Sequence, residues 1–318
     1  MAAPALDLVA IGSAVIDYIH HVTVLPRPDE GVFILERRVS PGGVEGNVAV
    51  AAAALGLGAG MIAHIGTDEP GRMILADFQE RGVDVSRMQI GGDGDTAYSL
   101  VFVDDDGARF IMSGGRGVRG LTLDDDDLRF VGHARCCFAS GYLPWPHLSR
   151  VAQCCRDENG PLFAFDLPGT FADLSRRGLR PEHLDAIVPD IDLFLADRAS
   201  LRSYTGEEDP IAGLRVLRDK GVSRAVVSDG KRGLHLLDCR NGSDDIHSMP
   251  AFAIEAVDTT GAGDVLHAAL IAEWLLAGRP ARAAARFAAA AAALVCRDWG
   301  VRTALPSREE AEALASRV

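Results

Sequence analysis

Asp258-Thr259-Thr260-Gly261-Ala262-Gly263-Asp264 is the stretch on which the interpretation of the whole chain depends. It follows a strand-like run at 251–257 and precedes a long apolar helix predicted over 265–277. Small residues at such a turn let a ligand approach the backbone, and the first amides of a helix have no intrahelical partner. The sequence therefore predicts an anion site at the amides of 261–264.

Asp264 stands at the start of the predicted helix, where the positive end of the helix dipole is expected to favour its ionised form. A carboxylate beside an amide cradle suits phosphoryl transfer, because the amides bind phosphate charge and the carboxylate accepts a hydroxyl proton. The alternative is an ordinary glycine-rich helix start capped by Asp. The complete heptad favours the chemical interpretation.

A second glycine-rich stretch, Gly42-Gly43-Val44-Glu45-Gly46-Asn47, lies much earlier in the chain. The two stretches, in this order, resemble the N-terminal and C-terminal signatures of the ribokinase-like (PfkB) carbohydrate kinases, and the resemblance runs from about Val9 to Pro306. It implies transfer of a phosphoryl group from ATP, with Mg²⁺, to a sugar hydroxyl. Asp264 would be the catalytic base, and Gly261, Ala262 and Gly263 would form the anion hole.

The order of segments predicts an α/β fold. Strand-like and helix-like segments alternate along most of the chain, which is typical of a doubly wound, mostly parallel sheet flanked by helices. The alternation is interrupted by extended segments and by a hairpin around an acidic turn at 104–107. We expect a core of 1–14, 42–91 and 119–318, and a small β-sheet lid of 15–41 and 92–118. The lid would exclude water from the transferring phosphoryl group.

The resemblance also assigns substrate contacts. A strand-like run follows Asp17, and Asp166 comes after another strand, at the edge where ligands of α/β sheets bind. Carboxylates accept hydroxyl donors well, whereas an exposed strand-edge Asp is the structural alternative for Asp17. Asn47 offers a donor and an acceptor to hydroxyls, or simply caps its helix. The substrate-binding candidates are Asp17, Gly42, Gly43, Asn47, Arg109 and Asp166.

Two departures from the family pattern concern metal and substrate. An Asn-x-x-Glu tetrad that organises magnesium in the family is replaced by Asp197-Arg198-Ala199-Ser200, so Asp197 would hold hydrated Mg²⁺ while Ser200 is a weak substitute for Glu. The Asn and Arg that often follow the Asp at position 166 are missing. By resemblance alone, Asp258 and Thr260 would help to hold a monovalent cation such as K⁺. The nucleotide candidates are Asp197, Ser228, Gly230, Gly233, Thr259, Gly261 and Gly263.

Composition excludes several classes of protein. Hydrophobic residues make up 48% of the 318 residues, and the formal net charge is −13, which argues against a nucleic-acid or anionic-membrane surface. The six cysteines have no metal-ligand spacing and predict buried free thiols. No signal peptide or membrane span is visible, so we expect a cytoplasmic protein. Lid-to-lid homodimers occur in the family.

Other functions remain open on the sequence. A kinase of the same fold for a nucleoside or a sugar phosphate is one alternative, with Arg109, Arg116 and Arg119 as candidates for a phosphate. A binding regulator without catalysis is another, supported by the altered tetrad. A dehydrogenase is disfavoured, because the glycines of 56–60 lie between a helix and a strand. His267, on the same helix face as Asp264, is expected to be packed. The sequence does not identify the sugar or the hydroxyl.

Overall fold

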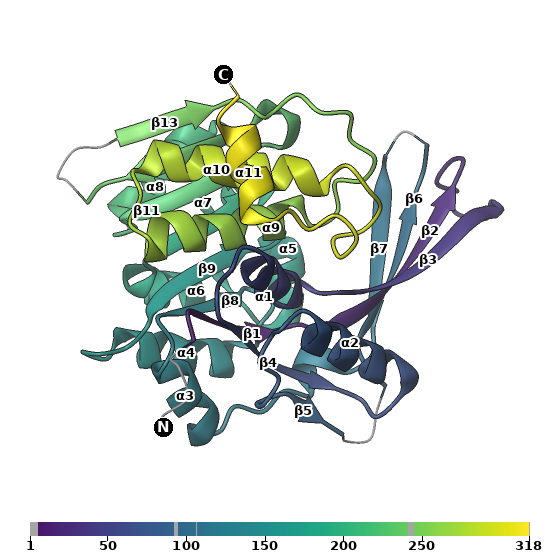
Figure 1. The fold of residues 1–318 in the computed structure, drawn as a ribbon, viewed down its shortest axis with the longest axis horizontal. Helices are drawn as coiled ribbons and strands as arrows, with labels where there is room; N and C mark the ends of the chain where they lie inside the picture. The colour runs from purple at the N-terminus through teal and green to yellow at the C-terminus, as the bar shows by residue number, and fades with distance from the viewer. Residues whose placement is uncertain (1–5, 92–94, 106, 241–244, 318) are drawn as a thin grey trace.

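A nine-stranded sheet forms the centre of the computed structural model, which describes residues 6–91, 95–105, 107–240 and 245–317 (Figure 1). Its strand order is β13-β12-β11-β10-β9-β8-β1-β4-β5. The strands from β5 to β11 pair in parallel, whereas β12 and β13 are antiparallel additions at one edge. The strands are β1 (Leu8–Gly12), β4 (Ala59–Ile65), β5 (Gln89–Ile90), β8 (Cys136–Ser140), β9 (Leu162–Leu167), β10 (Leu193–Asp197), β11 (Arg224–Ser228), β12 (Leu234–Asp238) and β13 (Asp245–Met249).

Helices cover both faces of this sheet, and each face has its own buried apolar cluster. The central parallel strands are fully buried runs, as expected when both faces are covered. One face packs against α1 (Val44–Ala54), α2 (Glu69–Glu80), α9 (Ala262–Leu270), its π-helical continuation Ile271–Leu276, α10 (Ala281–Val295) and α11 (Arg308–Ala315). The other packs against α3 (Asp125–Gly132), α4 (Trp145–Arg156), α5 (Phe171–Leu174), α6 (Pro181–Ile187), α7 (Arg198–Thr205) and α8 (Pro210–Asp219). The predicted doubly wound fold is confirmed.

A separate four-stranded sheet projects beside the helical layers, on the right of Figure 1. Its order is β3-β2-β6-β7, with β2 and β6 parallel and the outer pairs antiparallel. Its strands are β2 (Val15–Val22), β3 (Ile34–Gly42), β6 (Tyr98–Val103) and β7 (Arg109–Gly114). The expected smaller sheet and its hairpin are therefore present. Asp106 of the hairpin turn lies outside the described residues.

The chain crosses between the two sheets at two adjacent places, after β1 and before α1. β1 ends at Gly12 and β2 begins three residues later, while β3 runs directly into α1 through Gly42 and Gly43. A Cβ on Gly43, which has φ 94°, would stand 2.6 Å from the carbonyl oxygen of Ser13. Glycine is therefore required where α1 starts against the end of the first strand.

One predicted strand is wrong. Residues 251–257 form no strand, and the last strand before the heptad is β13. This mostly apolar segment is extended and lies along the surface, where only Phe252 and Ile254 are partly covered. A hydrogen bond from Val257 N–H to the carbonyl oxygen of Cys296, at 2.8 Å, holds its end in place.

All six cysteines are free, and three of them, Cys136, Cys137 and Cys296, are buried. Among the described residues, none of the helices has the length and apolar character that crossing a bilayer requires.

Candidate functional site

The site is built at the carboxyl ends of the parallel strands. Strand register places Ser140 of β8 beside Asp166 of β9, and Asp197 of β10 beside Ser228 of β11. Asp166 in turn pairs with Leu195, two residues before Asp197. In an open α/β sheet this edge is where ligands bind, at the switch of strand order. The sequence candidates on three separate strands therefore meet at one edge.

The amide turn of the heptad begins at a glycine that no other residue can replace without strain. Gly261 has φ 75°, and a Cβ there would stand 2.0 Å from Cγ2 of Val301. α9 starts directly after it, at Ala262. The first intrahelical bond is donated by Val265 N–H to the carbonyl oxygen of Gly261 at 3.0 Å. Ala262 N–H donates to the carbonyl oxygen of Thr259 at 3.3 Å, and among the described residues the amides of Gly263 and Asp264 at the helix start have no backbone acceptor.

Asp264 and Asn47 join the two glycine-rich motifs. Nδ2 of Asn47 donates to Oδ2 of Asp264 at 2.7 Å, across the packed pair of helices α1 and α9. Asn47 is buried, and its Oδ1 has no partner among the described residues. The contact fixes the carboxylate rotamer and leaves an amide oxygen at the same place to accept from a bound group.

The sequence predicts that Asp264 is ionised, whereas its surroundings in the structure favour the protonated form. Burial raises the pKa of Asp264 to about 7, and the nearby Glu45 and Asp17 carboxylates add to the rise, while the Asn47 hydrogen bond and Arg302 oppose it. The expected effect of the helix terminus is therefore outweighed by desolvation. A carboxyl group with a pKa near 7 is well matched to proton transfer near neutral pH.

Glu45 is a functional-site residue that the sequence analysis did not single out. Its side chain is fully buried. Oε2 accepts from the amide of Ser13 at 2.9 Å and from its hydroxyl, and Oε1 accepts from the amide of Ser140 at 3.1 Å and from its hydroxyl. One carboxylate thus ties the first turn of α1 to the ends of β1 and β8. A glutamate in an otherwise apolar, alanine-rich helix was the available signal.

Asp17 lies inside β2, not ahead of the strand. A Cβ on Gly42 would stand 2.0 Å from Oδ2 of Asp17, so glycine at that position makes room for the carboxylate. Burial raises the pKa of Asp17 to about 6, against the lowering effects of a Ser99 hydrogen bond and of Arg302. Asp17 is therefore no exposed strand-edge residue, and it faces the same turn as Asn47.

Asp258 organises the loop that precedes α9. Oδ1 accepts from the amide of Thr260 at 2.9 Å and from its hydroxyl at 2.7 Å, and Oδ2 accepts from the amide of Gly300 at 2.9 Å. Arg109 of β7 reaches the same loop, with Nη1 3.4 Å from Oγ1 of Thr260. The small sheet therefore contacts the heptad directly.

The nucleotide-side candidates form a second turn. Gly233 has φ 102°, and a Cβ there would stand 1.9 Å from the carbonyl oxygen of Met249. Asp197 is exposed and caps α7, with Oδ1 accepting from the amide of Ser200 at 2.7 Å and from its hydroxyl at 2.8 Å. Ser200 is buried, and both its amide and its hydroxyl are engaged by Asp197. Asp229, between the two candidates Ser228 and Gly230, is paired with arginines.

Asp166 and His267 form a buried pair near Asp264. Nε2 of His267 lies 3.9 Å from Oδ1 of Asp166. Burial lowers the pKa of His267 to about 3. Burial and the carboxylates of Asp264, Glu45 and Asp197 hold the pKa of Asp166 well above its usual range. The expected packed histidine is confirmed, and it packs against a candidate residue.

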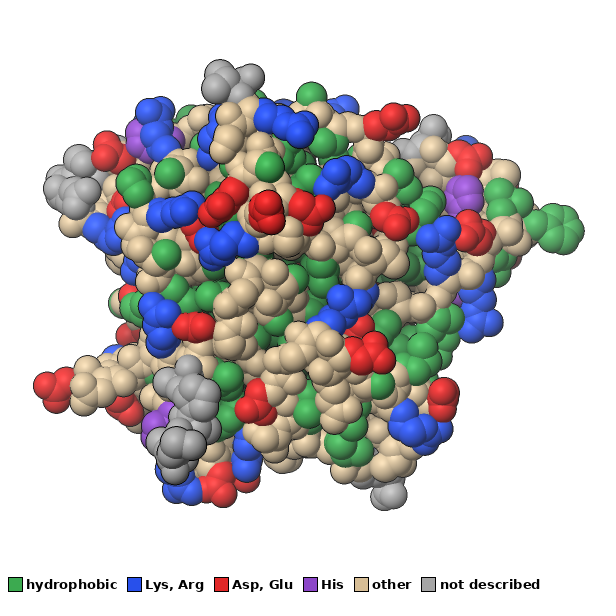
Figure 2. Space-filling view, in the orientation of Figure 1, with side chains coloured by type: hydrophobic (Ala, Val, Ile, Leu, Met, Phe, Trp, Pro, Cys, Tyr) green, Lys and Arg blue, Asp and Glu red, His purple; other side chains and the backbone are tan. Residues whose placement is uncertain are grey.

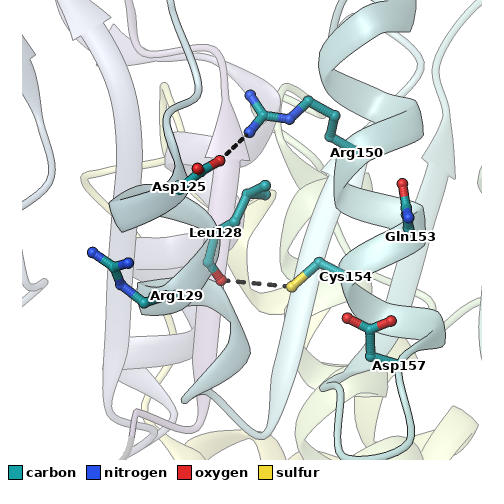
Figure 3. A pocket seen from close by; sticks show the side chains of 7 residues that line it. All are labelled: Asp125, Leu128, Arg129, Arg150, Gln153, Cys154 and Asp157. Carbon is teal, nitrogen blue, oxygen red and sulfur yellow. Dashed lines mark hydrogen bonds and ion pairs between the residues drawn. The ribbon is translucent and has the colours of Figure 1, made fainter.

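A hollow of about 360 Å³ lies elsewhere, between α3 and α4 (Figure 3). An ion pair of Arg150 with Asp125 crosses it at 2.8 Å, and the Cys154 thiol donates to the carbonyl oxygen of Leu128. None of the candidate residues lines it. Within the described part of the chain, the side chains of Arg116 and Arg119, at the short turn after β7, make no hydrogen bond or ion pair with the candidate residues, whereas Arg109 bonds Thr260.

The comparisons with known proteins agree with this geometry. Residues 5–308 match the model of the pfkB family carbohydrate kinases. This chain belongs to that family. A nucleoside kinase of Methanothermobacter thermautotrophicus is 27% identical over 96% of this chain and 94% of its own length. An ATP-dependent ribose-1-phosphate kinase of Halopiger xanaduensis is 30% identical over 88% of each chain. The pfkB kinase described here is thus an ATP-dependent phosphotransferase.

Solved structures show the same fold. The kinase superposes with a TM-score of 0.80 on Arabidopsis thaliana ribokinase complexed with ribose and ATP, at 24% identity, covering 99% of this chain and 100% of that one. These three proteins are named for different phosphoryl acceptors, which are a nucleoside, a sugar phosphate and a free sugar. The family therefore establishes the reaction class and leaves the acceptor open.

Proposed function

We propose that the kinase transfers the γ-phosphoryl group of ATP to a hydroxyl of a sugar, with Asp264 as the general base. The observation that carries this proposal is the 2.7 Å bond from Asn47 to Asp264, which brings the two glycine-rich motifs into one site. The pKa of about 7 for Asp264 supports it, because a base must be deprotonated at the working pH and still accept a proton.

In the proposed mechanism, Asp17 and the Asn47 Oδ1 accept hydroxyl donors of the sugar and orient the reacting hydroxyl toward Asp264. Gly42 and Gly43 let the sugar lie against the backbone, and Asp166 borders it. Asp264 removes the hydroxyl proton as the oxygen attacks the γ-phosphorus of ATP, and the bond from this phosphorus to the β-phosphate oxygen breaks, which releases ADP. The amides of 261–264 donate to the phosphoryl oxygens, where preorganised donors lower the barrier most effectively. The small sheet, within residues 15–41 and 92–118, would act as a lid that excludes water. The core would then comprise residues 1–14, 42–91 and 119–318.

Magnesium fits this site through the exposed carboxylate of Asp197, since hard cations take carboxylate oxygens directly or through water. Among the described residues no cluster of three metal-ligating side chains occurs, so ATP phosphates would supply most ligands. Bound Mg²⁺ would neutralise phosphate charge during transfer. Ser228, Gly230, Gly233 and Thr259 would contact the nucleotide.

For a monovalent cation such as K⁺, Asp258 and Thr260 fit as oxygen ligands, because the loop already gathers their oxygens beside Gly300. We expect activity to rise when K⁺ replaces tetramethylammonium at equal ionic strength. Equal rates in both salts would contradict this cation site.

A sugar phosphate is the second candidate acceptor, and a specific observation favours it. Arg109 reaches from β7 to Thr260, so a guanidinium lies at the lid side of the site. It suits an anionic group on the substrate as well as the ATP phosphates. A preference for phosphorylated sugars in the screen below would support this role.

A screen of ADP formation tests the proposed function. The kinase, ATP, Mg²⁺ and K⁺ would be incubated with pentoses, ketohexoses, their phosphates and nucleosides, and ADP would be measured against a sugar-free blank. We expect sugar-dependent ADP with one acceptor. Sugar binding by calorimetry without ADP from any acceptor would instead favour a binding regulator, for which the Asp197–Ser200 departure is the structural argument.

We further propose a homodimer through the small sheet. Large apolar side chains of this sheet and its leading loop are exposed, with Phe33 90% accessible, and Figure 2 shows hydrophobic atoms gathered on that side of the molecule. Exposed apolar side chains gathered on one small sheet favour an interaction surface there. The exposed members are Phe33, Ile34, Leu35, Val39, Phe110, Ile111 and Met112.

Light scattering would check the dimer. The wild type is expected to have twice the chain mass, and Ile111→Asp in the sheet is expected to give the monomer mass. Met73→Asp, an equally apolar exposed position on α2, is the control and should leave the mass doubled. A monomeric wild type would contradict the proposal.

A further inference from the structure

Arg302 is a buried arginine that the mechanism above does not use. It is 6% exposed, in the loop between α10 and α11. Nη1 lies 2.9 Å from Oδ2 of Asp77, Nε donates to the carbonyl oxygen of Pro41 at 3.3 Å, and the guanidinium lies 5.5 Å from the Phe78 ring centroid. Nη2 has no partner among the described residues. Burying a charged donor without a partner is costly, so packing alone does not explain this side chain.

The position of Arg302 connects it to the site. Its Nε contact, Pro41, directly precedes Gly42, which makes room for Asp17. Its Nη2 lies 3.4 Å from where a Cβ of Gly46 would stand, and Gly46 directly precedes Asn47. The guanidinium therefore lies behind the 41–47 turn. Pro41 directly precedes the glycine that adjoins Asp17, and Gly46 directly precedes the asparagine that bonds Asp264. The three anchors of Arg302, on α2 and β3, keep the charge in place.

We propose that Arg302 is a positioning residue of the kinase, a fixed cation behind the 41–47 turn that keeps Asp17 and Asp264 in the ionised form that the reaction requires. This inference deepens the proposed function and rests on it. Arg302 contacts no substrate. It acts through the two carboxylates, which would otherwise be neutral near pH 7 because they are desolvated and lie close to one another.

The charges around the site agree with this role. Asp264 on α9 is faced by Glu45 of α1, Asp17 of β2 and Asp166 of β9, and these carboxylates disfavour its ionisation. His267 on the same helix is neutral, because burial lowers its pKa to about 3. Arg302 lowers the pKa of both Asp17 and Asp264.

Arg302 itself stays protonated at neutral pH. Burial lowers its pKa to about 10, with Arg81 acting in the same direction and Asp77, Asp17 and Asp264 opposing. The cation is therefore permanent across the working range of the enzyme, and its effect on the carboxylates does not itself titrate.

Arg302→Gln tests the proposal, with two readouts. The pH midpoint of kcat/KM is expected to move up by about one unit from its wild-type value, because an opposing charge is removed. The Asp264 carboxyl titration, followed by carbon NMR in Asp-labelled protein and assigned with Asp264→Asn, should move by the same amount. Arg72→Gln is the control: it removes an exposed arginine of α2 that pairs with Glu69 at 2.7 Å and leaves the Arg302–Asp77 pair in place, so both midpoints should stay.

Asp77→Asn gives an opposite expectation and remains informative if Arg302→Gln fails to fold. Without the Asp77 carboxylate, the positive charge of Arg302 is less neutralised. The pH midpoint of kcat/KM and the titration midpoint of Asp264 should therefore both move down. A purely structural role would lower activity at every pH and leave the midpoints unchanged. Unmoved midpoints in Arg302→Gln, or in Asp77→Asn if the first variant is unfolded, would overturn the proposal.

The two proposals can fail separately. NMR titration needs no turnover, so it tests Arg302 even if the wild type forms no ADP with any acceptor, the result that would remove the proposed function. An active wild type with unmoved midpoints in the variants would overturn the Arg302 inference alone.

Discussion

Asp264→Asn is expected to lower kcat at pH 8 by about 10²–10⁴-fold, the usual contribution of a positioned base. The substitution keeps the size of the side chain, and its carbonyl oxygen accepts the Asn47 Nδ2–H in place of the Asp264 carboxylate oxygen. The anion hole and the sugar contacts are unchanged, so KM is expected to change much less than kcat. The loss then reports the proton acceptor rather than binding.

Steady-state kinetics with the acceptor found in the screen would measure this effect. Asp185→Asn is the matched control, because Asp185 is a carboxylate bonded to Lys220 far along the chain from the heptad, and its kcat should equal the wild type. A loss below about tenfold for Asp264→Asn would contradict the base assignment, since even a modest general base contributes more.

Thermal unfolding separates this result from damage to the fold. Because the pKa of Asp264 is raised in the folded protein, the ionised carboxylate destabilises the fold as pH rises from the usual Asp range through about 7. Removing it should leave the unfolding temperature at pH 8 equal to that of the wild type or higher. An inactive variant that is at least as stable is the signature of a site residue kept at a cost in stability.

The fold could be predicted from the sequence because its signals are local. Buried runs such as 8–12 and 136–140 and the glycine-rich starts of α1 and α9 each depend on neighbours in the chain. The smaller sheet was predicted from a change in this alternation. The strand predicted at 251–257 is wrong, because an apolar run does not report whether a neighbouring strand is there to pair with it.

The electrostatics of the site could not be predicted in this way. The helix terminus suggested an ionised Asp264, yet burial raises its pKa to about 7, and Glu45, Arg302 and Asp17, which come from three distant segments, modify that rise. The position of Arg302 behind the 41–47 turn depends on its contacts with Asp77 and Phe78 of α2. The distances between these charged groups depend on the tertiary structure and cannot be derived from residue spacing along the chain.

Glu45→Ala is expected to destabilise the fold more than other single substitutions at the site, by about 4 kcal/mol or more. The carboxylate accepts four hydrogen bonds, from the amides and hydroxyls of Ser13 and Ser140. Each buried donor left without an acceptor costs about 1–3 kcal/mol. The total is a large fraction of the roughly 5–15 kcal/mol that keeps a domain folded.

Denaturant unfolding of Glu45→Ala, Glu45→Gln and the control Glu80→Ala would measure this. Glu80 is exposed at the end of α2, so its removal should change the free energy of unfolding by less than about 0.5 kcal/mol. Gln keeps one acceptor oxygen but turns an amide toward donors, so it should fall between the two. A loss below about 1 kcal/mol for Glu45→Ala would mean that water replaces all four bonds. The carboxylate would then be dispensable for holding α1, and with it Asn47, against the ends of β1 and β8.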